Sequence, residues 1–338
     1  MSNTGNTGNT GNTGNTGNTG NAGINGDVGG GWILPDRADF PFAMEADSSG
    51  NPLGLLSRKV YIHDETGGGA KKKVAFRISN AAGSASVAFD DRNWAGRWYA
   101  WRVLKQFSAS NWDSQGLNNL LIDMVLDLNT SVMGKTKQEH EYEALLAMAR
   151  DERASALGEI LAQDVEFITA FMEALAITPG SHPRTFRVLH IASLLGSFTA
   201  LYYKDLIDRP RPSWELPALM PPLPVPGHSA FPSGHATQAH LMAKCLAFVF
   251  TLTSPVMPAP HQAALNETLG ALARRVARNR EIAGLHYPSD SAAGYALASE
   301  VFAKVSDHPG GNGSAASHYA FRTFGKAVLQ AAKEWEAS

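Results

Sequence analysis

Three short segments of this 338-residue chain concentrate side chains that bind anions and move protons. The first, Lys204 to Pro212, reads Lys-Asp-Leu-Ile-Asp-Arg-Pro-Arg-Pro, and the second, Pro232 to His235, reads Pro-Ser-Gly-His. The third, Asn279 to Asp290, reads Asn-Arg-Glu-Ile-Ala-Gly-Leu-His-Tyr-Pro-Ser-Asp. Cations, a Ser-Gly pair at a helix start and two histidines are suited to hold a tetrahedral oxyanion and to transfer protons around it.

The cations and the Ser-Gly pair predict an anion site. Lys204, Arg211 and Arg280 can neutralise a tetrahedral anion from several sides, because arginine offers a planar fork and lysine a compact charge. Ser233 and Gly234 are expected where a loop enters a helix, since Ser caps helices well and Gly permits close backbone approach. The free N–H groups of that helix start attract an anion.

The two histidines are predicted to lie at helix starts. His235 follows one residue inside the first of these helices, next to the expected anion. Pro288 suits the first position of a second helix, which puts His286 just ahead of it and Asp290 in its first turn. Asp290 would then hold one ring nitrogen of His286 and leave the other free to attack or to ligate.

Helical spacing of apolar residues predicts an all-α bundle with the site at one end, built from helix termini and loops. The predicted helices are Trp94 to Phe107, Leu117 to Val132, Gln138 to Ile177 in two pieces, Phe186 to Leu206, His235 to Leu252, His261 to Ile282, Ser289 to Val305 and Ala316 to Glu336. The Pro-rich stretch Arg209 to Pro232 is expected to be an irregular loop, and loops of that length are usually functional.

The N-terminal third differs from the bundle. Residues 3–20 are six copies of Asn-Thr-Gly, which cannot bury apolar surface, so disorder is expected over residues 1–31. Residues 32–110 are expected to form a segment packing on the bundle, and Val60 to His63 and Lys73 to Ile78 suit a hairpin or a loop with short strands. Residues 111–338 would form the helical catalytic domain.

Composition limits the partners and the compartment. A net charge of −2 and a pI near 6.6 do not suggest a nucleic-acid partner. Cys245 is the only cysteine, so there is no internal disulfide and no zinc-type spacing. The best apolar stretches, Val188 to Tyr203 and Leu241 to Val256, fall short of a membrane span. With no signal peptide visible, a soluble, cytoplasmic protein is expected, and oligomerisation stays open.

Taken together, the three segments resemble the split signature of the PAP2 superfamily, which includes acid phosphatases, lipid phosphate phosphatases and vanadium-dependent haloperoxidases. That signature runs Lys-x6-Arg-Pro, Pro-Ser-Gly-His and Ser-Arg-x5-His-x3-Asp, and only Asn279 departs from it. Asn can donate and accept hydrogen bonds where Ser would. Any one segment alone would be read as a loop or a turn, but three in the right order and spacing are far more specific.

The resemblance implies a helical bundle of the acid phosphatase/vanadium haloperoxidase type and a role for each signature residue. His286 would attack phosphorus and form a phosphohistidine, His235 would act as general acid and base, and Asp290 would orient His286. The residues implied in phosphate or vanadate binding are Lys204, Arg211, Ser233, Gly234 and Arg280.

Three functions remain open, and the first is preferred. A metal-free phosphatase would hydrolyse phosphomonoesters or pyrophosphates and need no cofactor. A vanadium-dependent haloperoxidase would carry vanadate on His286 and use peroxide to oxidise a halide. A non-catalytic protein would bind an oxyanion only, although the complete set of signature residues argues against this reading.

Four further residues near the signature have two readings each. The aromatic residues Trp214, Phe231 and Tyr287 either shape a substrate or halide pocket or simply pack. His228, in the loop before Pro-Ser-Gly-His, either lines the mouth of the pocket or is an exposed loop histidine.

Overall fold

The computed structural model describes residues 45–46, 52–53, 59–65, 73–80, 83–87, 94–253, 257–308 and 316–336. The disorder predicted for residues 1–31 lies outside these residues. Contacts divide the chain into two units, of which Gly30–Ala95 carries β1 to β5 and Gly96–Ser338 carries the helices.

The strand unit contains a three-stranded antiparallel sheet in the order β3-β4-β5. Its described strands are β1 (Glu45–Ala46), β2 (Pro52–Leu53), β3 (Lys59–Glu65), β4 (Lys73–Asn80) and β5 (Gly83–Val87). All of β3 pairs with residues Lys73 to Ser79 of β4, which confirms the predicted hairpin, and β5 extends it. The packing of residues 32–110 on the bundle stays a prediction.

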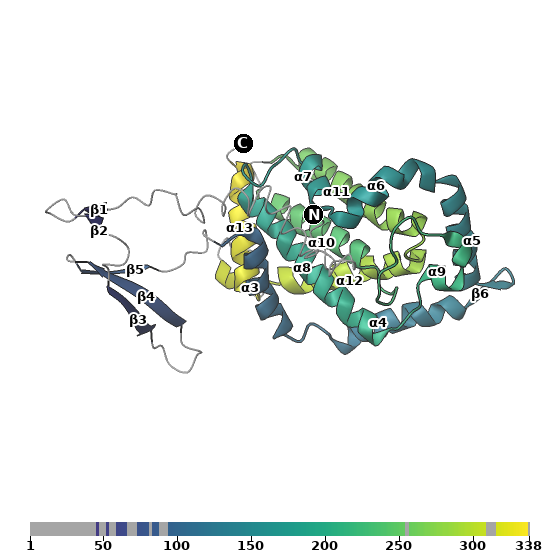
Figure 1. Cartoon of the computed structure of the whole chain (residues 1–338), viewed down its shortest axis with the longest axis horizontal. Helices are drawn as coiled ribbons and strands as arrows, with labels where there is room; N and C mark the ends of the chain where they lie inside the picture. The colour runs from purple at the N-terminus through teal and green to yellow at the C-terminus, as the bar shows by residue number, and fades with distance from the viewer. Residues whose placement is uncertain are drawn as a thin grey trace. The chain divides into compact units, whose positions relative to one another are not determined.

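The described part of the second unit is built mainly of helices, which confirms the all-α fold (Figure 1). The α-helices are α3 (Gly96–Ser108), α4 (Gln115–Leu126), α5 (Lys137–Asp151), α6 (Arg153–Val165), α7 (Ile168–Ala174), α8 (Pro183–Leu206), α9 (Pro212–Glu215), α10 (Gly234–Leu252), α11 (Ala259–Ile282), α12 (Pro288–Ser306) and α13 (Arg322–Glu336). The shorter elements are η4 (Asp127–Asn129), η5 (Pro217–Leu219), η6 (Ala316–His318), β6 (Ser131–Val132) and β7 (Lys135–Thr136).

Several predicted elements have different boundaries in the structure. The helix predicted over Ala316 to Glu336 is divided into η6 and α13, and the stretch predicted as an irregular loop contains the short helices α9 and η5. The helix expected to run to Val132 ends at Leu126 and passes into η4, after which Thr130 is extended. Met133 and Gly134 then take positive φ angles in the turn between β6 and β7. The stretch expected as two helices up to Ile177 forms three, since Glu166 is extended and separates α6 from α7. Helical periodicity persisted across both breaks and hid them.

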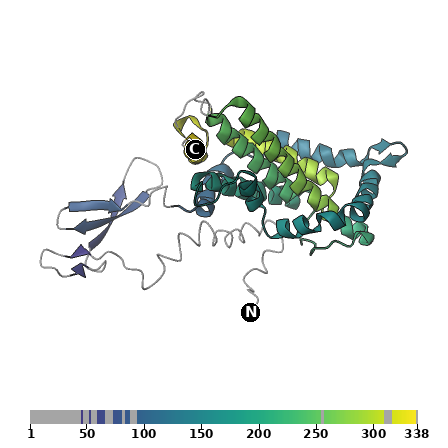
Figure 2. The same cartoon turned by 90° about the horizontal axis from the view of Figure 1, so that it is seen from above.

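Helices α8 and α10 form the centre of the helical unit. Helix α8 packs against α3, α10 and α13, while α10 also packs against α11 and α12, and Figure 2 shows α10 to α12 running side by side. Both central helices are buried on most sides, as expected for helices rich in apolar residues all round. Among the described residues, no helix combines the length and apolarity needed to cross a membrane.

Close helix packing occurs where α12 meets the start of α10. A Cβ atom added at Gly294 would lie 2.8 Å from the Ala236 Cβ atom and 2.8 Å from the Ser233 carbonyl oxygen. The Ser233 N–H group also donates a hydrogen bond of 2.9 Å to the Asp290 carbonyl oxygen. The first turns of α10 and α12 are therefore joined directly.

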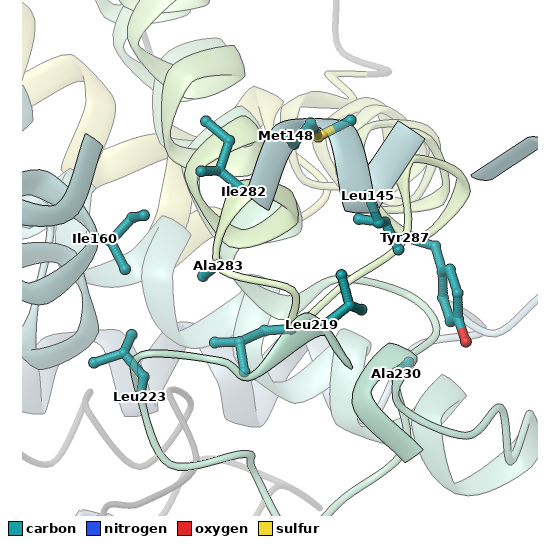
Figure 3. Close-up of a cluster of buried hydrophobic side chains, with 10 residues drawn as sticks. Leu145, Met148, Ile160, Leu219, Leu223, Ala230, Ile282, Ala283 and Tyr287 are labelled. Carbon is teal, nitrogen blue, oxygen red and sulfur yellow. The ribbon is translucent and has the colours of Figure 1, made fainter. Parts of the chain in front are cut away.

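An apolar cluster supports the loops at the site end (Figure 3). Its buried members come from α5, α6, the Pro-rich loop and the turn between α11 and α12; they are Leu145, Met148, Ile160, Leu219, Leu223, Ala230, Ile282, Ala283, Leu285 and Tyr287. The guanidinium group of Arg153 reinforces the cluster, donating to the Ile282 carbonyl oxygen at 2.9 Å and to the Leu219 carbonyl oxygen at 2.6 Å. Helices α5 and α6 thus hold the signature loops in place.

The Gly294→Ala substitution should destabilise the protein. Overpacking of a close contact typically costs about 1–3 kcal/mol, because backbone and side chains must shift to admit the methyl group. Thermal unfolding should therefore show a lower Tm. The matched control is Gly158→Ala in α6, where nothing lies within 4 Å of the added Cβ atom and helix propensity favours Ala. Equal Tm values for Gly294→Ala and wild type would contradict the close-packing argument.

One buried histidine makes the stability of the fold depend on pH. His190 in α8 lies against Phe186, and within the described residues its Nε2 atom has no hydrogen-bond partner. Burial, with a smaller effect of Arg97, lowers the pKa of His190 from 6.5 to about 3. Below pH 6.5 the unfolded chain therefore takes up a proton that the folded chain excludes.

This uptake predicts a loss of stability in acid that His190→Phe should reduce. The contribution of neutral His190 to the free energy of unfolding is fully present above pH 6.5. It is lost as the pH falls toward about 3, at up to ~1.4 kcal/mol per pH unit. Urea unfolding at several pH values should give a flatter pH profile for His190→Phe than for wild type. His261→Phe, at an exposed histidine, is the control. If the pH profiles of wild type and His190→Phe were parallel, His190 would not be the cause of the loss of stability in acid.

Candidate functional site

The three signature segments meet at the ends of α8, α10, α11 and α12. Lys204 lies near the end of α8, and Arg280 near the end of α11. The remaining predicted site residues lie at helix starts: Arg211 precedes α9, Ser233 and Gly234 begin α10 with His235 next, and His286 precedes α12, whose first turn contains Asp290. All eight are buried.

His286 lies between a carboxylate and a guanidinium group. Its Nδ1 atom is 3.1 Å from Asp290 Oδ2, and its Nε2 atom is 3.1 Å from Arg211 Nη1. Because arginine can only donate hydrogen bonds, Nε2 must accept one, and the proton of the neutral ring must therefore be on Nδ1. Both neighbours thus favour the same tautomer, in which Nε2 carries the lone pair.

Asp290 holds this position because it also caps α12. Its Oδ2 atom accepts the Tyr287 N–H group at 3.0 Å, as a carboxylate in the first turn of a helix commonly does. Pro288 is the first residue of the helix, as predicted, and needs no partner for an N–H group. The local sequence that starts α12 therefore also sets the partner of His286.

Two of the three cationic candidates for anion binding bond to backbone carbonyl oxygens. Lys204 Nζ donates to the carbonyl oxygens of Ser229 (2.7 Å) and Ala230 (2.8 Å), and Arg211 donates to those of His228 (2.9 Å) and Leu285 (2.8 Å). Burial, assisted by the charge of Arg211, lowers the pKa of Lys204 well below its usual value. Burial also lowers the pKa of Arg211, to about 10. The region is thus strongly electropositive and partly dehydrated.

Arg280 and His235 form the other side of the site. Arg280 Nη2 donates to Asp164 Oδ1 at 3.0 Å. His235 Nε2 is 3.0 Å from the Gln163 carbonyl oxygen, which can only accept, so Nε2 carries the proton of the neutral ring. The ring of Phe167 stacks on His235 with centroids 4.8 Å apart.

Both histidines are strongly biased toward the neutral state. Burial lowers the pKa of His235 well below 6.5, and the nearest cation, Arg280, lowers it further. Burial also lowers the pKa of His286 well below 6.5, assisted by Arg211 and then Lys204. A neutral imidazole has a lone pair to offer an electrophile, whereas a protonated one does not.

Asn279, the one departure from the signature, bonds away from His286. Its Nδ2 atom donates to Glu159 Oε2 at 3.0 Å and to Gln163 Oε1 at 2.9 Å. The same Gln163 holds His235 through its backbone carbonyl oxygen. Asn279 therefore steadies the residue that orients His235.

Sequence reasoning missed two charged residues of the site. Arg209 donates to Asp290 Oδ1 at 2.6 Å and to Glu141 Oε2 at 2.9 Å, and all three side chains are buried. The only sequence signal for Arg209 was the doubled Arg-Pro in the first segment. Glu141 gave no signal, because it comes from α5, far from the signature in sequence.

The flanking aromatic residues divide into packing and exposed groups. Phe231 and Tyr287 are fully buried, and Tyr287 belongs to the apolar cluster, so both pack. Trp214 is 70% exposed. His228 is half-buried beside Arg211, with its Nδ1 atom 3.0 Å from Arg211 Nη2, and burial lowers its pKa to about 4. His228 thus lines the site.

One family model and one curated protein from two bacterial strains match this chain. The model of the PAP2 superfamily matches residues 187–306, which include all eight predicted site residues. The chain is 30% identical over 144 residues to the decaprenylphosphoryl-5-phosphoribose phosphatase of two Mycobacterium tuberculosis strains, an alignment that covers 43% of this chain and 71% of the relative.

A solved structure of a transmembrane PAP2 type phosphatidylglycerolphosphate phosphatase from Bacillus subtilis also matches, with a TM-score of 0.30 and 16% identity. That match covers 60% of this chain and 90% of the other. From the family match and the similarity to the mycobacterial phosphatase, this chain belongs to the PAP2 superfamily.

Proposed function

We propose that this protein is a phosphatase that hydrolyses phosphomonoesters or pyrophosphates through a phosphohistidine on His286 and needs no metal. The observation that carries the proposal is the position of His286, which lies between Asp290 and Arg211 in the tautomer that leaves a lone pair on Nε2. That arrangement supplies a neutral nitrogen nucleophile next to fixed positive charge.

In the first step, Nε2 of His286 attacks phosphorus, and the bond between phosphorus and the leaving oxygen breaks. The imidazole becomes cationic as it forms the N–P bond, and the Asp290 carboxylate at Nδ1 stabilises that charge. Arg211 must then donate to phosphate oxygens instead of to Nε2. Lys204 and Arg280, with the N–H groups at the start of α10, stabilise the negative charge of the transition state.

His235 transfers the protons in this scheme. Its Nε2–H group is bonded to Gln163, so Nδ1 must take up a proton when substrate binds, and the resulting imidazolium delivers that proton to the leaving oxygen. A bound phosphate raises the pKa of His235 and so opposes the lowering by burial and by Arg280. In the second step His235 takes a proton from water, the water oxygen bonds to phosphorus, and the N–P bond breaks to release phosphate.

The mycobacterial relative favours ester hydrolysis over halide oxidation, because its name describes a phosphatase. The same residues would also fit vanadate, with His286 as ligand and Lys204, Arg211 and Arg280 around its oxygens; a bound vanadate would supply the centre that activates peroxide. The haloperoxidase function is therefore the second candidate, and a non-catalytic oxyanion-binding protein the third.

Oxyanions should stabilise the protein through the three cations. Orthovanadate or phosphate at 100 times its Kd should add ~2.7 kcal/mol to the free energy of unfolding, because it binds only the folded chain. Thermal unfolding with and without the anion measures this effect. Arg211→Met should abolish the anion-dependent rise in Tm, whereas Arg150→Gln, at an exposed arginine paired with Asp151, should retain it. If the anion raised the Tm of Arg211→Met as much as that of wild type, Arg211 would not be part of the anion site.

Hydrolysis of a chromogenic phosphomonoester by metal-stripped protein should be measurable and should be inhibited by vanadate. His286→Ala should abolish it because the nucleophile is lost, and His235→Ala should lower kcat by roughly 10²–10⁴-fold. His261→Ala, at an exposed histidine, should leave it unchanged.

A parallel assay with vanadate, peroxide and bromide separates the alternatives. Vanadate-dependent bromination with negligible ester cleavage would replace the phosphatase by the haloperoxidase. Anion binding without turnover of any phosphorylated substrate or halide would favour the non-catalytic protein.

A further inference from the structure

We propose that Glu141 and Arg209 position Asp290, and through it His286, as a buried chain of charged side chains behind the nucleophile. This inference rests on the proposed function, because it concerns the orientation of that nucleophile. Neither residue contacts His286 or the proposed anion-binding groups, so both are positioning residues.

The chain begins at the carboxylate of Asp290, whose two oxygen atoms have separate partners. Oδ2 contacts His286 Nδ1 at 3.1 Å and the Tyr287 N–H group at 3.0 Å, while Oδ1 accepts from Arg209 Nη1 at 2.6 Å. Since Asp290 is completely buried, no water can substitute for Arg209 at Oδ1 without a change in packing. Arg209 therefore fixes the plane of the carboxylate that orients the imidazole.

Arg209 is itself held from the other side by Glu141. Its Nη2 atom donates to Glu141 Oε2 at 2.9 Å. Glu141 also accepts the Ser289 N–H group through Oε1 at 2.6 Å and the Ser289 hydroxyl through Oε2 at 2.9 Å. Ser289 is the second residue of α12, where an N–H group lacks a helical partner and a negative charge is favoured. Glu141 thus joins α5 to the start of α12 and secures Arg209 between them.

The planar shape of the Arg209 guanidinium group contributes to its position as well as its charge. Arg209 Cζ lies 3.7 Å from the centroid of the Tyr287 ring, so the ring restricts the position of the guanidinium. Its Nη1 atom additionally donates to Ser289 Oγ at 2.7 Å. A lysine would keep the charge but could neither stack in this way nor bond to both carboxylates with fixed geometry.

The charges around Arg209 also support its role in positioning Asp290. Burial alone would lower the pKa of Arg209, but Asp290 and Glu141 outweigh it, so the pKa is raised and Arg209 stays charged. Arg211, two residues later, bonds to carbonyl oxygens and to the lone pair of His286. The two arginines of the Arg-Pro-Arg-Pro segment therefore have different roles. Arg209 holds the Asp290 carboxylate, and Arg211 faces the nucleophilic Nε2 atom of His286.

The test compares Arg209→Gln, Arg209→Lys and Glu141→Gln in the full chain. For p-nitrophenyl phosphate, Arg209→Gln should lower kcat about 10–100-fold, as loss of a group that orients a histidine through its partner typically does, with little change in KM. Arg209→Lys should recover part of kcat because it keeps the charge near Asp290. Glu141→Gln, which is isosteric, should have a smaller effect in the same direction.

A spectroscopic readout separates positioning from simple stabilisation. With ¹⁵N-labelled histidine, the His286 signals, assigned with His286→Ala, should show a protonated Nδ1 and a bare Nε2 in wild type. Arg209→Gln should shift both signals toward a mixture of tautomers. The control is Arg278→Gln, which also removes an arginine paired with two carboxylates, Glu152 and Glu281, and which should change neither kcat nor the spectrum.

A lower Tm in Arg209→Gln with kcat and the His286 signals unchanged would overturn the inference and leave only a structural ion pair. If Arg209→Gln does not fold, Glu141→Gln decides by the same two readouts. The spectrum can be recorded without turnover, so it tests the inference separately from the proposed function. If wild type hydrolysed no phosphoester but Arg209→Gln still lost the His286 tautomer, the proposed function would be refuted and the positioning chain retained.

Discussion

Four cations are buried at one end of the bundle: Lys204, Arg209, Arg211 and Arg280. Their burial is the constraint on which the rest of the structure depends. A buried charge must be paired or hydrogen-bonded, and an interior site allows few alternatives. The partners include three carboxylates and four backbone carbonyl oxygens, which belong to Glu141, Asp164, Asp290, Ser229, Ala230, His228 and Leu285. These carbonyl groups lie outside regular helices, where they are free to accept. The irregular path of the Pro-rich loop therefore satisfies a requirement of the charges it surrounds.

Asp290 connects this charge cluster to the folding of α12. Its side chain accepts from the helix N-terminus, from Arg209 and from His286 at the same time. The carboxylate that caps the helix is thus also the group that bonds to the imidazole. The surrounding cations and burial keep His286 neutral, and Asp290 is the group that stabilises positive charge on it. Local structure and chemistry are thus set by the same few atoms.

The sequence predicted the parts of the site that local rules control. The positions of Lys204 near a helix end, of Ser233 at a helix start and of Pro288 as a first helical residue follow from spacing and capping preferences. Glu141 and Arg209 could not be predicted, because their pairing depends on how α5 packs beside the loop. Local rules likewise missed the break at Glu166, where the chain leaves helical geometry although apolar periodicity continues.

The junction at Gly294 determines how the two histidine-bearing turns are held relative to one another. The first turns of α10 and α12 are in van der Waals contact there, and the Ser233 N–H group bonds to the backbone of Asp290. Moving one helix away from the other would break these contacts, so the packing at Gly294 fixes the spacing between the turns that carry His235 and His286.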